Sequence, residues 1–224
     1  MKKITQQFVV LGLGVFGSTV AKTLSEYNCE VLAIDRDIKC VDRVAEFVTQ
    51  AVQSDITDKE QLRAAGAGEC DIAIVGTGSH LEESVMAIIN LKELGVPYII
   101  AKAKNKRYMQ IFSRVGADRV IRPEKEIGEQ VAKSILSNNI VDMIDIDEEY
   151  SIMEVKAPGK WVGRTLKDLD ARNKYGINVL GIRKQSDLHL SISPDADYII
   201  EADDHMMVIA DVKTFEKFDF LKKI

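Results

Sequence analysis

The first part of the chain repeats one pattern, in which a short apolar run is followed by a turn and an amphipathic stretch. The apolar runs are rich in β-branched residues, which is typical of strands covered on both faces of a parallel sheet. They occupy residues 8–14, 30–35, 47–52, 71–76, 97–102 and 118–122. The stretches between them predict helices near residues 16–28, 38–46, 58–65, 80–94 and 105–115. This alternation predicts an α/β fold, a Rossmann-like doubly wound parallel sheet.

A longer helix is predicted to begin at Pro123, because proline suits the first turn of a helix and acidic residues follow it. Its apolar residues are spaced so that they make one stripe along the helix. They are Ile127, Val131, Ile135 and Leu136.

The pattern changes after Asn139. Strands with alternating faces are predicted at residues 140–147, 150–157, 177–184, 188–193, 197–202 and 205–212. Helices are predicted near residues 165–170 and over the last segment, 214–223. This is the pattern of a small α+β domain with mostly antiparallel strands.

The charge distribution supports a division at the same place. Residues 1–140 hold 18 Lys and Arg against 18 Asp and Glu, whereas residues 141–224 hold 12 against 17, which accounts for the whole net charge of −5. We therefore predict a nucleotide-binding domain over residues 1–140, including the long helix, and a ligand-binding or dimerisation domain over residues 141–224.

Composition excludes several classes of function. The acidic balance and an aromatic content of 6% argue against a nucleic-acid partner. No apolar run approaches the length of a membrane span, and the first residues lack a signal-peptide pattern. Cys29, Cys40 and Cys70 have no C-x-x-C spacing and indicate neither a disulfide framework nor a zinc site. A cytoplasmic location is the simplest interpretation.

A glycine fingerprint carries the strongest chemical signal. Gly12, Gly14 and Gly17 form G-x-G-x-x-G directly after the first strand, where they allow a tight turn and the approach of a pyrophosphate. Asp35 ends the second strand, where an acid accepts hydrogen bonds from ribose hydroxyls. The same carboxylate repels a ribose 2′-phosphate, so NADP is disfavoured despite the adjacent Arg36. The pattern predicts an adenine nucleotide in this crevice.

Further candidates follow the third, fourth and fifth strands, at the edge where open α/β sheets bind ligands. Asp55 and Ile56 are placed to reach an adenine edge, although Asp55 or Asp58 is equally suited to cap the next helix.

The run Thr77-Gly78-Ser79-His80 follows the fourth strand, with small residues that let a ligand come close, and a plain turn with a helix cap explains it equally well. Lys102 ends the fifth strand, where it either meets a phosphate or is simply solvated.

No catalytic constellation accompanies the nucleotide signal. His80, His189 and His205 are scattered, and neither a nucleophile elbow nor an H-E-x-x-H motif occurs. We therefore expect the nucleotide to act as a signal, and the chain not to be an enzyme. The alternative is an NAD-dependent oxidoreductase or an NAD-redox sensor with this fold.

Four segments carry a resemblance to a known family. They are VVLGLGVFGSTVAKTLSE, VLAIDRD, GADRVIRPEKEIGEQVA and EYSIMEV. With these segments, nearly the whole chain resembles the RCK (KTN) regulatory subunits of bacterial potassium uptake systems, of the Ktr and TrkA type.

The resemblance implies an N-terminal RCK domain that binds ATP, ADP or NAD(H), and a long helix that crosses over to a second subunit. It implies dimers that assemble into an octameric gating ring under a membrane K⁺-transporting subunit of the KtrB or TrkH kind. The chain would then associate with the membrane peripherally. It also implies that Glu124 holds Mg²⁺ or Ca²⁺ beside the phosphates, although an acid that stabilises the helix start is an equal explanation.

One position departs from the family fingerprint. Where Ktr proteins have an arginine that reaches the terminal phosphate, this chain has Val15, followed by Phe16. The loss of a charge-assisted contact puts discrimination of ATP from ADP in doubt and favours ADP, AMP or NAD(H).

The second domain resembles the RCK C-terminal module, which binds cyclic di-AMP in related proteins. An arginine for a phosphate and an asparagine for a base edge suit such a ligand. Ordinary hairpin and interface packing is the alternative explanation of the same residues. The matching positions are Leu166, Asp170, Arg172, Ile177, Asn178 and Pro194.

Overall fold

The computed structural model describes residues 6–78, 80–135, 140–147, 149–187 and 189–211. The chain forms two compact units, Met1–Glu124 and Lys125–Ile224. Among the described residues, no helix is both long and apolar enough to cross a membrane.

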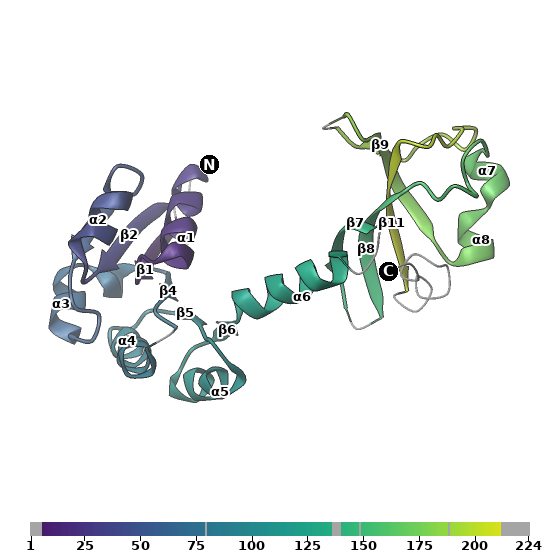
Figure 1. The fold of residues 1–224 in the computed structure, drawn as a ribbon. Coiled ribbons are helices and arrows are strands. Elements are labelled where there is room, and N and C mark those ends of the chain that lie inside the picture. Colours follow the sequence, from purple (N-terminus) through teal and green to yellow (C-terminus); the bar gives the residue numbers. More distant parts are fainter. Residues whose placement is uncertain (1–5, 79, 136–139, 148, 188, 212–224) are drawn as a thin grey trace. The chain divides into compact units, whose positions relative to one another are not determined.

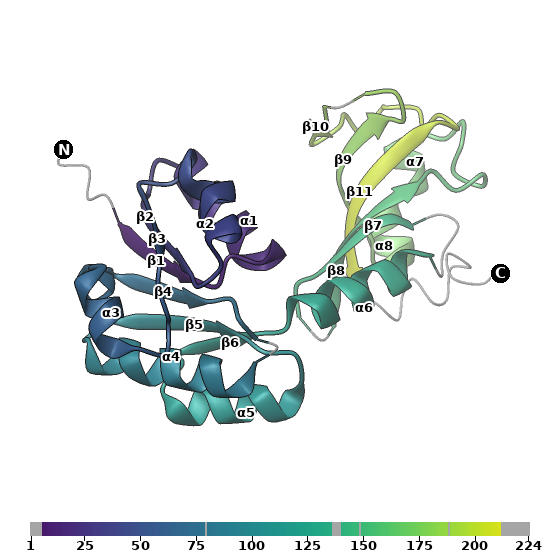
Figure 2. The same cartoon turned by 60° about the vertical axis from the view of Figure 1, so that its left-hand side comes forward.

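The first unit is built on a six-stranded parallel sheet (Figures 1 and 2). Its strands are β1 Gln7–Leu11, β2 Glu30–Asp35, β3 Gln50–Gln53, β4 Ile72–Val75, β5 Tyr98–Lys102 and β6 Arg119–Ile121. They lie in the order β3-β2-β1-β4-β5-β6, so the direction of the connections reverses between β1 and β4. The predicted Rossmann-like, doubly wound sheet is confirmed.

Five α-helices connect these strands, in the predicted order. They are α1 Val15–Glu26, α2 Ile38–Ala45, α3 Lys59–Ala64, α4 Leu81–Glu93 and α5 Lys106–Val115. A short 3₁₀ helix, η1 Ala67–Glu69, precedes β4 and was not predicted. It follows Gly66, whose φ of 89° ends α3 in a left-handed turn.

The helices cover both faces of the sheet, because alternate residues of each strand point in opposite directions. Phe8 and Val10 of β1 pack with residues of α1 and α2, such as Ala21. Val9 and Leu11 belong to a second cluster, which includes Leu62 of α3 and residues of α4 and α5. Burial on both sides explains why the strands read as continuous apolar runs.

The helix α6, Pro123–Ile135, begins where the sequence predicted, at the division between the two units. The predicted boundary near residue 140 lies beyond its end. The apolar stripe of α6 is exposed in this single chain, with exposed fractions of 58%, 52% and 70% for Ile127, Val131 and Ile135. Leu136, the fourth member of the stripe, lies outside the described residues.

The second unit contains a five-stranded antiparallel sheet in the order β10-β9-β11-β8-β7. Its strands are β7 Ile140–Asp145, β8 Tyr150–Lys156, β9 Asn178–Lys184, β10 Ser191–Ile192 and β11 Asp204–Asp211. Met153, Val155, Met206 and Val208 form the centre of its core, with Trp161. The predicted α+β domain is confirmed, and the predicted helix over 214–223 lies outside the described residues.

Two predictions for this unit were wrong in detail. The helix predicted near 165–170 is two short helices, α7 Leu166–Leu169 and α8 Ala171–Tyr175, because Asp170 between them has a left-handed φ of 47°. The segment 197–202 is not a strand and makes one isolated bridge, from Ile199 to Thr165.

A buried carboxylate explains why this segment does not extend a ladder. Asp204 is fully buried and accepts hydrogen bonds from the Tyr198 hydroxyl (3.0 Å) and the Glu201 amide (2.8 Å). Burial and this hydrogen bond raise the pKa of Tyr198 to about 12. The segment therefore folds back around one charged side chain.

We predict opposite outcomes for two alanine substitutions in the glycine turn. A Cβ atom on Gly17 would lie 1.9 Å from the Gly12 carbonyl oxygen, whereas one on Gly14 has no neighbour within 4 Å. Gly17→Ala should lower the free energy of unfolding by about 3 kcal/mol, and Gly14→Ala should change it by less than about 1 kcal/mol. Thermal unfolding of the full chain measures both, and an equal loss for the two variants would contradict the packing constraint.

Candidate functional site

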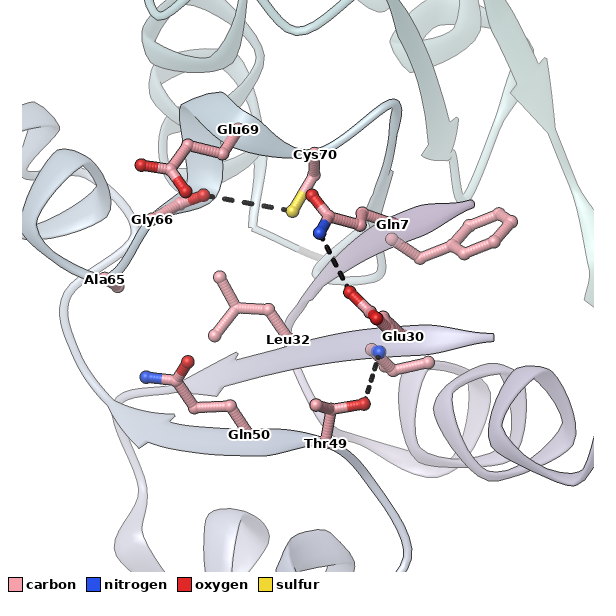
Figure 3. A pocket seen from close by; sticks show the side chains of 11 residues that line it. Gln7, Glu30, Leu32, Thr49, Gln50, Ala65, Gly66, Glu69 and Cys70 are labelled. Atoms are coloured by element: carbon pink, nitrogen blue, oxygen red, sulfur yellow. Dashed lines mark hydrogen bonds between the residues drawn. The ribbon is translucent and has the colours of Figure 1, made fainter. Parts of the chain in front are cut away.

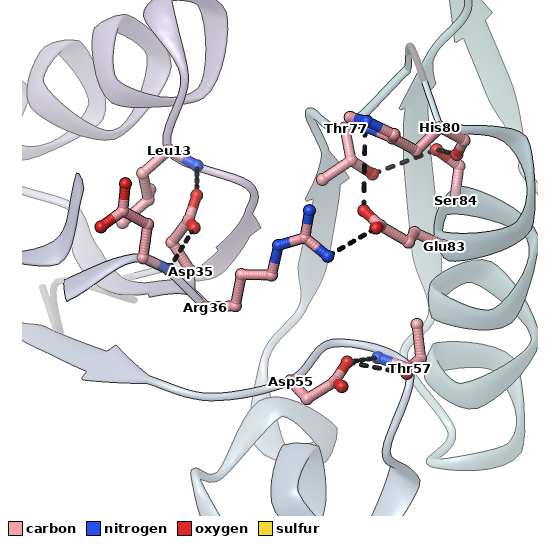
Figure 4. Close-up of polar contacts among 10 residues, drawn as sticks. Leu13, Asp35, Arg36, Asp55, Thr57, Thr77, His80, Glu83 and Ser84 are labelled. Carbon is pink, nitrogen blue, oxygen red and sulfur yellow. Dashed lines mark hydrogen bonds and ion pairs between the residues drawn. The ribbon is translucent and has the colours of Figure 1, made fainter. Parts of the chain in front are cut away.

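A crevice opens at the carboxyl ends of the parallel strands, where the strand order reverses (Figure 4). It encloses about 330 Å³. Open α/β sheets bind their ligands at this position. The lining residues come from the ends of β1 to β4, the loops that follow them, and the first turns of α2 and α4; they are Gly12, Gly14, Asp35, Arg36, Asp37, Cys40, Asp55, Ile56, Gly76, Thr77, His80 and Glu83.

The glycine turn brings the start of α1 against the sheet. Gly12 has a left-handed φ of 87°, and its amide donates to the Ile34 carbonyl at 2.9 Å. A Cβ atom on Gly76, at the end of β4, would lie 2.8 Å from the Gly12 carbonyl oxygen. Gly14 is the N-cap of α1 and provides no side-chain cap. The first amides of α1 are therefore available to a phosphate.

Asp35 is held in place by the backbone on both sides. Its carboxylate accepts one hydrogen bond from the Leu13 amide at 2.6 Å and another from the Asp37 amide at 2.8 Å. Each carboxylate oxygen has a second lone pair, so the group retains the capacity to accept from ribose hydroxyls. It links the glycine turn to the loop after β2.

Arg36 reaches across the crevice (Figure 4). Its Nη1 lies 2.7 Å from Oε1 of Glu83, in the first turn of α4. The second oxygen of Glu83 lies 3.8 Å from Nδ1 of His80. The backbone carbonyl of Arg36 accepts from the Gln53 side chain at 3.0 Å, which fixes the base of the arginine.

The structure separates the roles of the two acids after β3. Asp58 is the N-cap of α3, where its side chain accepts from the Glu60 and Gln61 amides. Asp55 accepts from the amide (2.8 Å) and hydroxyl (2.7 Å) of Thr57 instead. Asp55 is exposed and lines the crevice, so its carboxylate is available to a ligand.

The loop after β4 approaches β5 closely. Thr77 hydrogen-bonds Ser84 of α4 through the two hydroxyls at 3.0 Å. A Cβ atom on Gly78 would lie 2.2 Å from the Lys102 carbonyl oxygen, so only glycine fits there. Ser79, the third residue of the predicted run, lies outside the described residues.

Lys102 forms an ion pair with Glu124, at the start of α6. The hydrogen bond from Lys102 lowers the pKa of Glu124 below its ordinary value. The Lys102 ammonium also lies 5.6 Å from the centre of the Phe16 ring, in the first turn of α1. Val15, next to Phe16, is 85% exposed and carries no charge.

The donor set at Glu124 does not by itself suit a metal ion. Among the described residues, no group of three or more His, Cys, Asp or Glu side chains is arranged to hold one. The Glu124 carboxylate faces a lysine instead. A role of Glu124 as a Mg²⁺ or Ca²⁺ ligand therefore stays a prediction that requires phosphate oxygens, and we derive no step through a metal.

Seven of the predicted residues line the crevice. They are Gly12, Gly14, Asp35, Arg36, Asp55, Ile56 and Thr77. The others of the predicted set lie outside this lining: Val15, Phe16, Gly17, Gly78, Lys102 and Glu124. Five lining residues were not predicted, namely Asp37, Cys40, Gly76, His80 and Glu83. Gly76 and His80 are a predicted strand end and helix start, and Asp37 and Cys40 lie two residues beyond such positions, which is the signal that would have identified these four; no such signal marks Glu83.

A smaller pocket of about 150 Å³ lies at the opposite, amino-terminal ends of strands β1, β2 and β3 (Figure 3). There the Gln7 side chain donates to Glu30 at 2.8 Å, and the Val31 amide donates to Thr49 at 3.0 Å. Burial, with Asp71 and Glu69 nearby, raises the pKa of the Cys70 thiol to about 11. The thiol is therefore protonated near neutral pH, and the pocket offers no reactive nucleophile.

The second unit has a pocket of its own, of about 530 Å³. It lies between α7, α8, the start of β9 and the segment after β10. Asn173 donates to Asp170 at 2.8 Å, which orients that carboxylate beside the exposed Arg172. All six positions that the RCK resemblance singled out line this pocket: Leu166, Asp170, Arg172, Ile177, Asn178 and Pro194.

Comparisons with known proteins place the chain in a family. The TrkA-N domain model matches residues 8–123, and the TrkA-C domain model matches residues 150–220. The chain is 37% identical over 219 residues to Ktr system potassium uptake protein C of Bacillus subtilis, covering 98% of this chain and 97% of that protein. It is 35% identical to Ktr system potassium uptake protein A of the same organism, covering 96% of each.

Solved structures share the fold at low sequence identity. The GsuK RCK domain superposes with a TM-score of 0.67 at 14% identity over 100% of this chain, which spans about half (49%) of the GsuK chain. The GsuK channel bound to NAD gives the same TM-score and identity, with 40% of its chain covered. The chain thus belongs to the TrkA-N/TrkA-C (RCK) family and is homologous over nearly its full length to the KtrA and KtrC proteins of potassium uptake systems.

Proposed function

We propose that this chain is the nucleotide-sensing regulatory subunit of a Ktr-type potassium uptake system. Its relatives over nearly the whole chain are potassium uptake proteins. The observation that carries the nucleotide is the crevice lined by the Asp35 and Asp55 carboxylates and by Gly14, the N-cap residue directly before the first amides of α1. Ribose, phosphate and adenine edge each find a matching group there.

The family is one of regulatory subunits and not of enzymes, as the sequence predicted. The comparisons do not favour the oxidoreductase alternative, since the relatives that match nearly the whole chain are potassium uptake proteins. The ligand therefore acts by binding. It shifts the subunit between two states only as far as its affinities for those states differ.

The cations around the phosphate region favour ligands with few phosphates. Val15 offers no charge at the exposed start of α1, and Lys102 is engaged with Glu124. An additional terminal phosphate gains no charge-assisted contact from position 15. We infer that ADP, AMP or NAD(H) is bound in preference to ATP.

The partners follow from the same proposal. A second copy of the chain suits the exposed apolar stripe of Ile127, Val131 and Ile135, because such a stripe on α6 is stabilised by burial. A ring of such dimers, of the octameric kind, would contact a membrane K⁺-transporting subunit from the cytoplasmic side. Closure of the crevice by nucleotide would change the ring and hence K⁺ uptake.

Cyclic di-AMP is the proposed ligand of the pocket in the second unit. The pocket combines an exposed guanidinium from Arg172 with the Asn178 side chain and the apolar Ile177. A dinucleotide needs those three kinds of contact for its phosphates and bases.

The nucleotide proposal is tested by calorimetric titration of the full chain with ADP, AMP, ATP and NAD⁺. Asp35→Ala should weaken every adenosine ligand about tenfold or more, because a charged acceptor is lost. Asp71→Ala is the matched control. The Asp71 carboxylate also accepts a hydrogen bond from a backbone amide, that of Gln7 at 2.9 Å, but it lies at the amino-terminal ends of the strands, away from the crevice. Unchanged affinities in the Asp35 variant, with its fold intact, would contradict the site.

We predict that Val15→Arg introduces preference for ATP over ADP. The side chain is 85% exposed, so an arginine fits without repacking and reaches the terminal phosphate. The ratio of the two affinities should rise about three- to tenfold. Val15→Gln controls for length without charge, and an equal rise in that variant would refute the electrostatic explanation.

The proposal for the second pocket is tested by calorimetric titration with cyclic di-AMP. Arg172→Gln should weaken cyclic di-AMP about tenfold, because a charge-assisted phosphate contact is lost. Lys174→Gln, on the same short helix α8 but outside the pocket lining, should leave the affinity unchanged. Binding that is insensitive to Arg172, or equally sensitive to Lys174, would leave the pocket without this role.

A further inference from the structure

Two residues with opposite ligand preferences stand side by side after β2. An acid in the position of Asp35 accepts from a ribose 2′-hydroxyl, whereas an arginine in this loop serves a 2′-phosphate in NADP-binding folds. A crevice that presents both groups to the ribose discriminates poorly between a 2′-hydroxyl and a 2′-phosphate, unless one of the groups is bound to another residue. Asp35 is fixed in the crevice lining by hydrogen bonds from the amides of Leu13 and Asp37.

Arg36 is the residue that is engaged elsewhere. Its guanidinium crosses the crevice to Glu83 of α4, at 2.7 Å, and so points away from Asp35 (Figure 4). The Glu83 side chain is only 25% exposed and has His80 on its other side at 3.8 Å. The Arg36 side chain is 67% exposed, so solvent screens the pair, and its importance for a ligand is the position in which it holds the guanidinium.

The charges of the crevice lining also disfavour a phosphate at the ribose 2′ position. Four of the described lining residues carry carboxylates, namely Asp35, Asp37, Asp55 and Glu83, and one carries a guanidinium. With Arg36 neutralised by Glu83, the ribose end of the crevice presents uncompensated negative charge. A second phosphate at that end meets repulsion, and Arg36 is the one guanidinium or ammonium group among the described lining residues.

We propose that Glu83 is a specificity-determining residue of the nucleotide crevice. By holding Arg36 across the crevice, it withholds the guanidinium from a ribose 2′-phosphate and leaves recognition of the ribose to Asp35. The crevice therefore accepts adenosine nucleotides with a free ribose and rejects those phosphorylated at the 2′ position. This inference rests on the proposed nucleotide function and concerns the ligand class of the same site.

The experiment measures two affinities by calorimetry at fixed ionic strength, for 5′-AMP and for adenosine 2′,5′-bisphosphate. The wild-type chain should favour 5′-AMP. Glu83→Gln should raise the affinity for the bisphosphate relative to 5′-AMP about three- to tenfold, because the released guanidinium gains a phosphate partner. Thermal unfolding of the variant verifies that it is folded.

Three further variants separate release of Arg36 from a change in net charge. Glu82→Gln removes the same charge from the same first turn of α4, where Glu82 is exposed, and should leave the ratio unchanged. Arg36→Gln should not raise the ratio, since it removes the guanidinium and leaves the Glu83 carboxylate unpaired in the crevice, which adds repulsion for a second phosphate. In the double variant Arg36→Gln/Glu83→Gln the gain should disappear.

Each result decides the matter. If 5′-AMP binds but the ratio is the same in Glu83→Gln as in the wild type, the role of Glu83 is overturned and the nucleotide site stands. A gain that also occurs in Glu82→Gln, or that persists in the double variant, overturns it too, because charge alone would explain the effect. If the wild type binds no adenosine nucleotide, the proposed function and this inference fall together.

Discussion

The close approach of α1 to the sheet is the constraint on which the first unit depends. The Gly12 carbonyl oxygen lies where Cβ atoms on Gly17 and Gly76 would collide with it, at 1.9 Å and 2.8 Å. Three backbone segments therefore meet with no side chain between them. This contact lets α1 begin directly after the glycine turn, beside the paired strands β1 and β4, where the strand order reverses. The helix start can lie this close to the sheet because the contact has no side chains.

Charge is distributed along the crevice in a way that orients a ligand. Backbone amides are free at the start of α1, whereas acids gather on the loops after β2 and β3, at Asp35, Asp37 and Asp55. An anionic phosphate is stabilised at the first end and repelled at the second, where hydroxyl and amino donors are favoured. An adenosine nucleotide has its phosphates and its hydrogen-bond donors at opposite ends, and it matches this polarity in one orientation only.

The fold of the first unit could be predicted because its signals are local. Strand periodicity, the glycine spacing and Asp35 at a strand end each depend on a few neighbouring residues, and the parallel sheet follows from their order. The Arg36–Glu83 ion pair joins residues 47 positions apart, and nothing in the local pattern marks Glu83. In the second unit, the buried Asp204 draws Tyr198 and Glu201 inward, so an apolar run that reads as a strand becomes a fold-back. Tertiary contacts overrode local pattern in both cases.

Lys102 lies at the point where the nucleotide chemistry meets the start of α6. Its ammonium is bonded to Glu124, in the first turn of that helix, and lies 5.6 Å from the ring of Phe16 beside the glycine turn. A phosphate bound at the start of α1 would compete with Glu124 for this one cation. If Lys102 bound a phosphate, its ion pair with Glu124 would weaken. The Glu124 carboxylate would then depend more on its interaction with the helix dipole. Under the proposed function, the charge of a bound ligand would therefore act on the first turn of α6, the helix whose later turns carry the exposed apolar stripe.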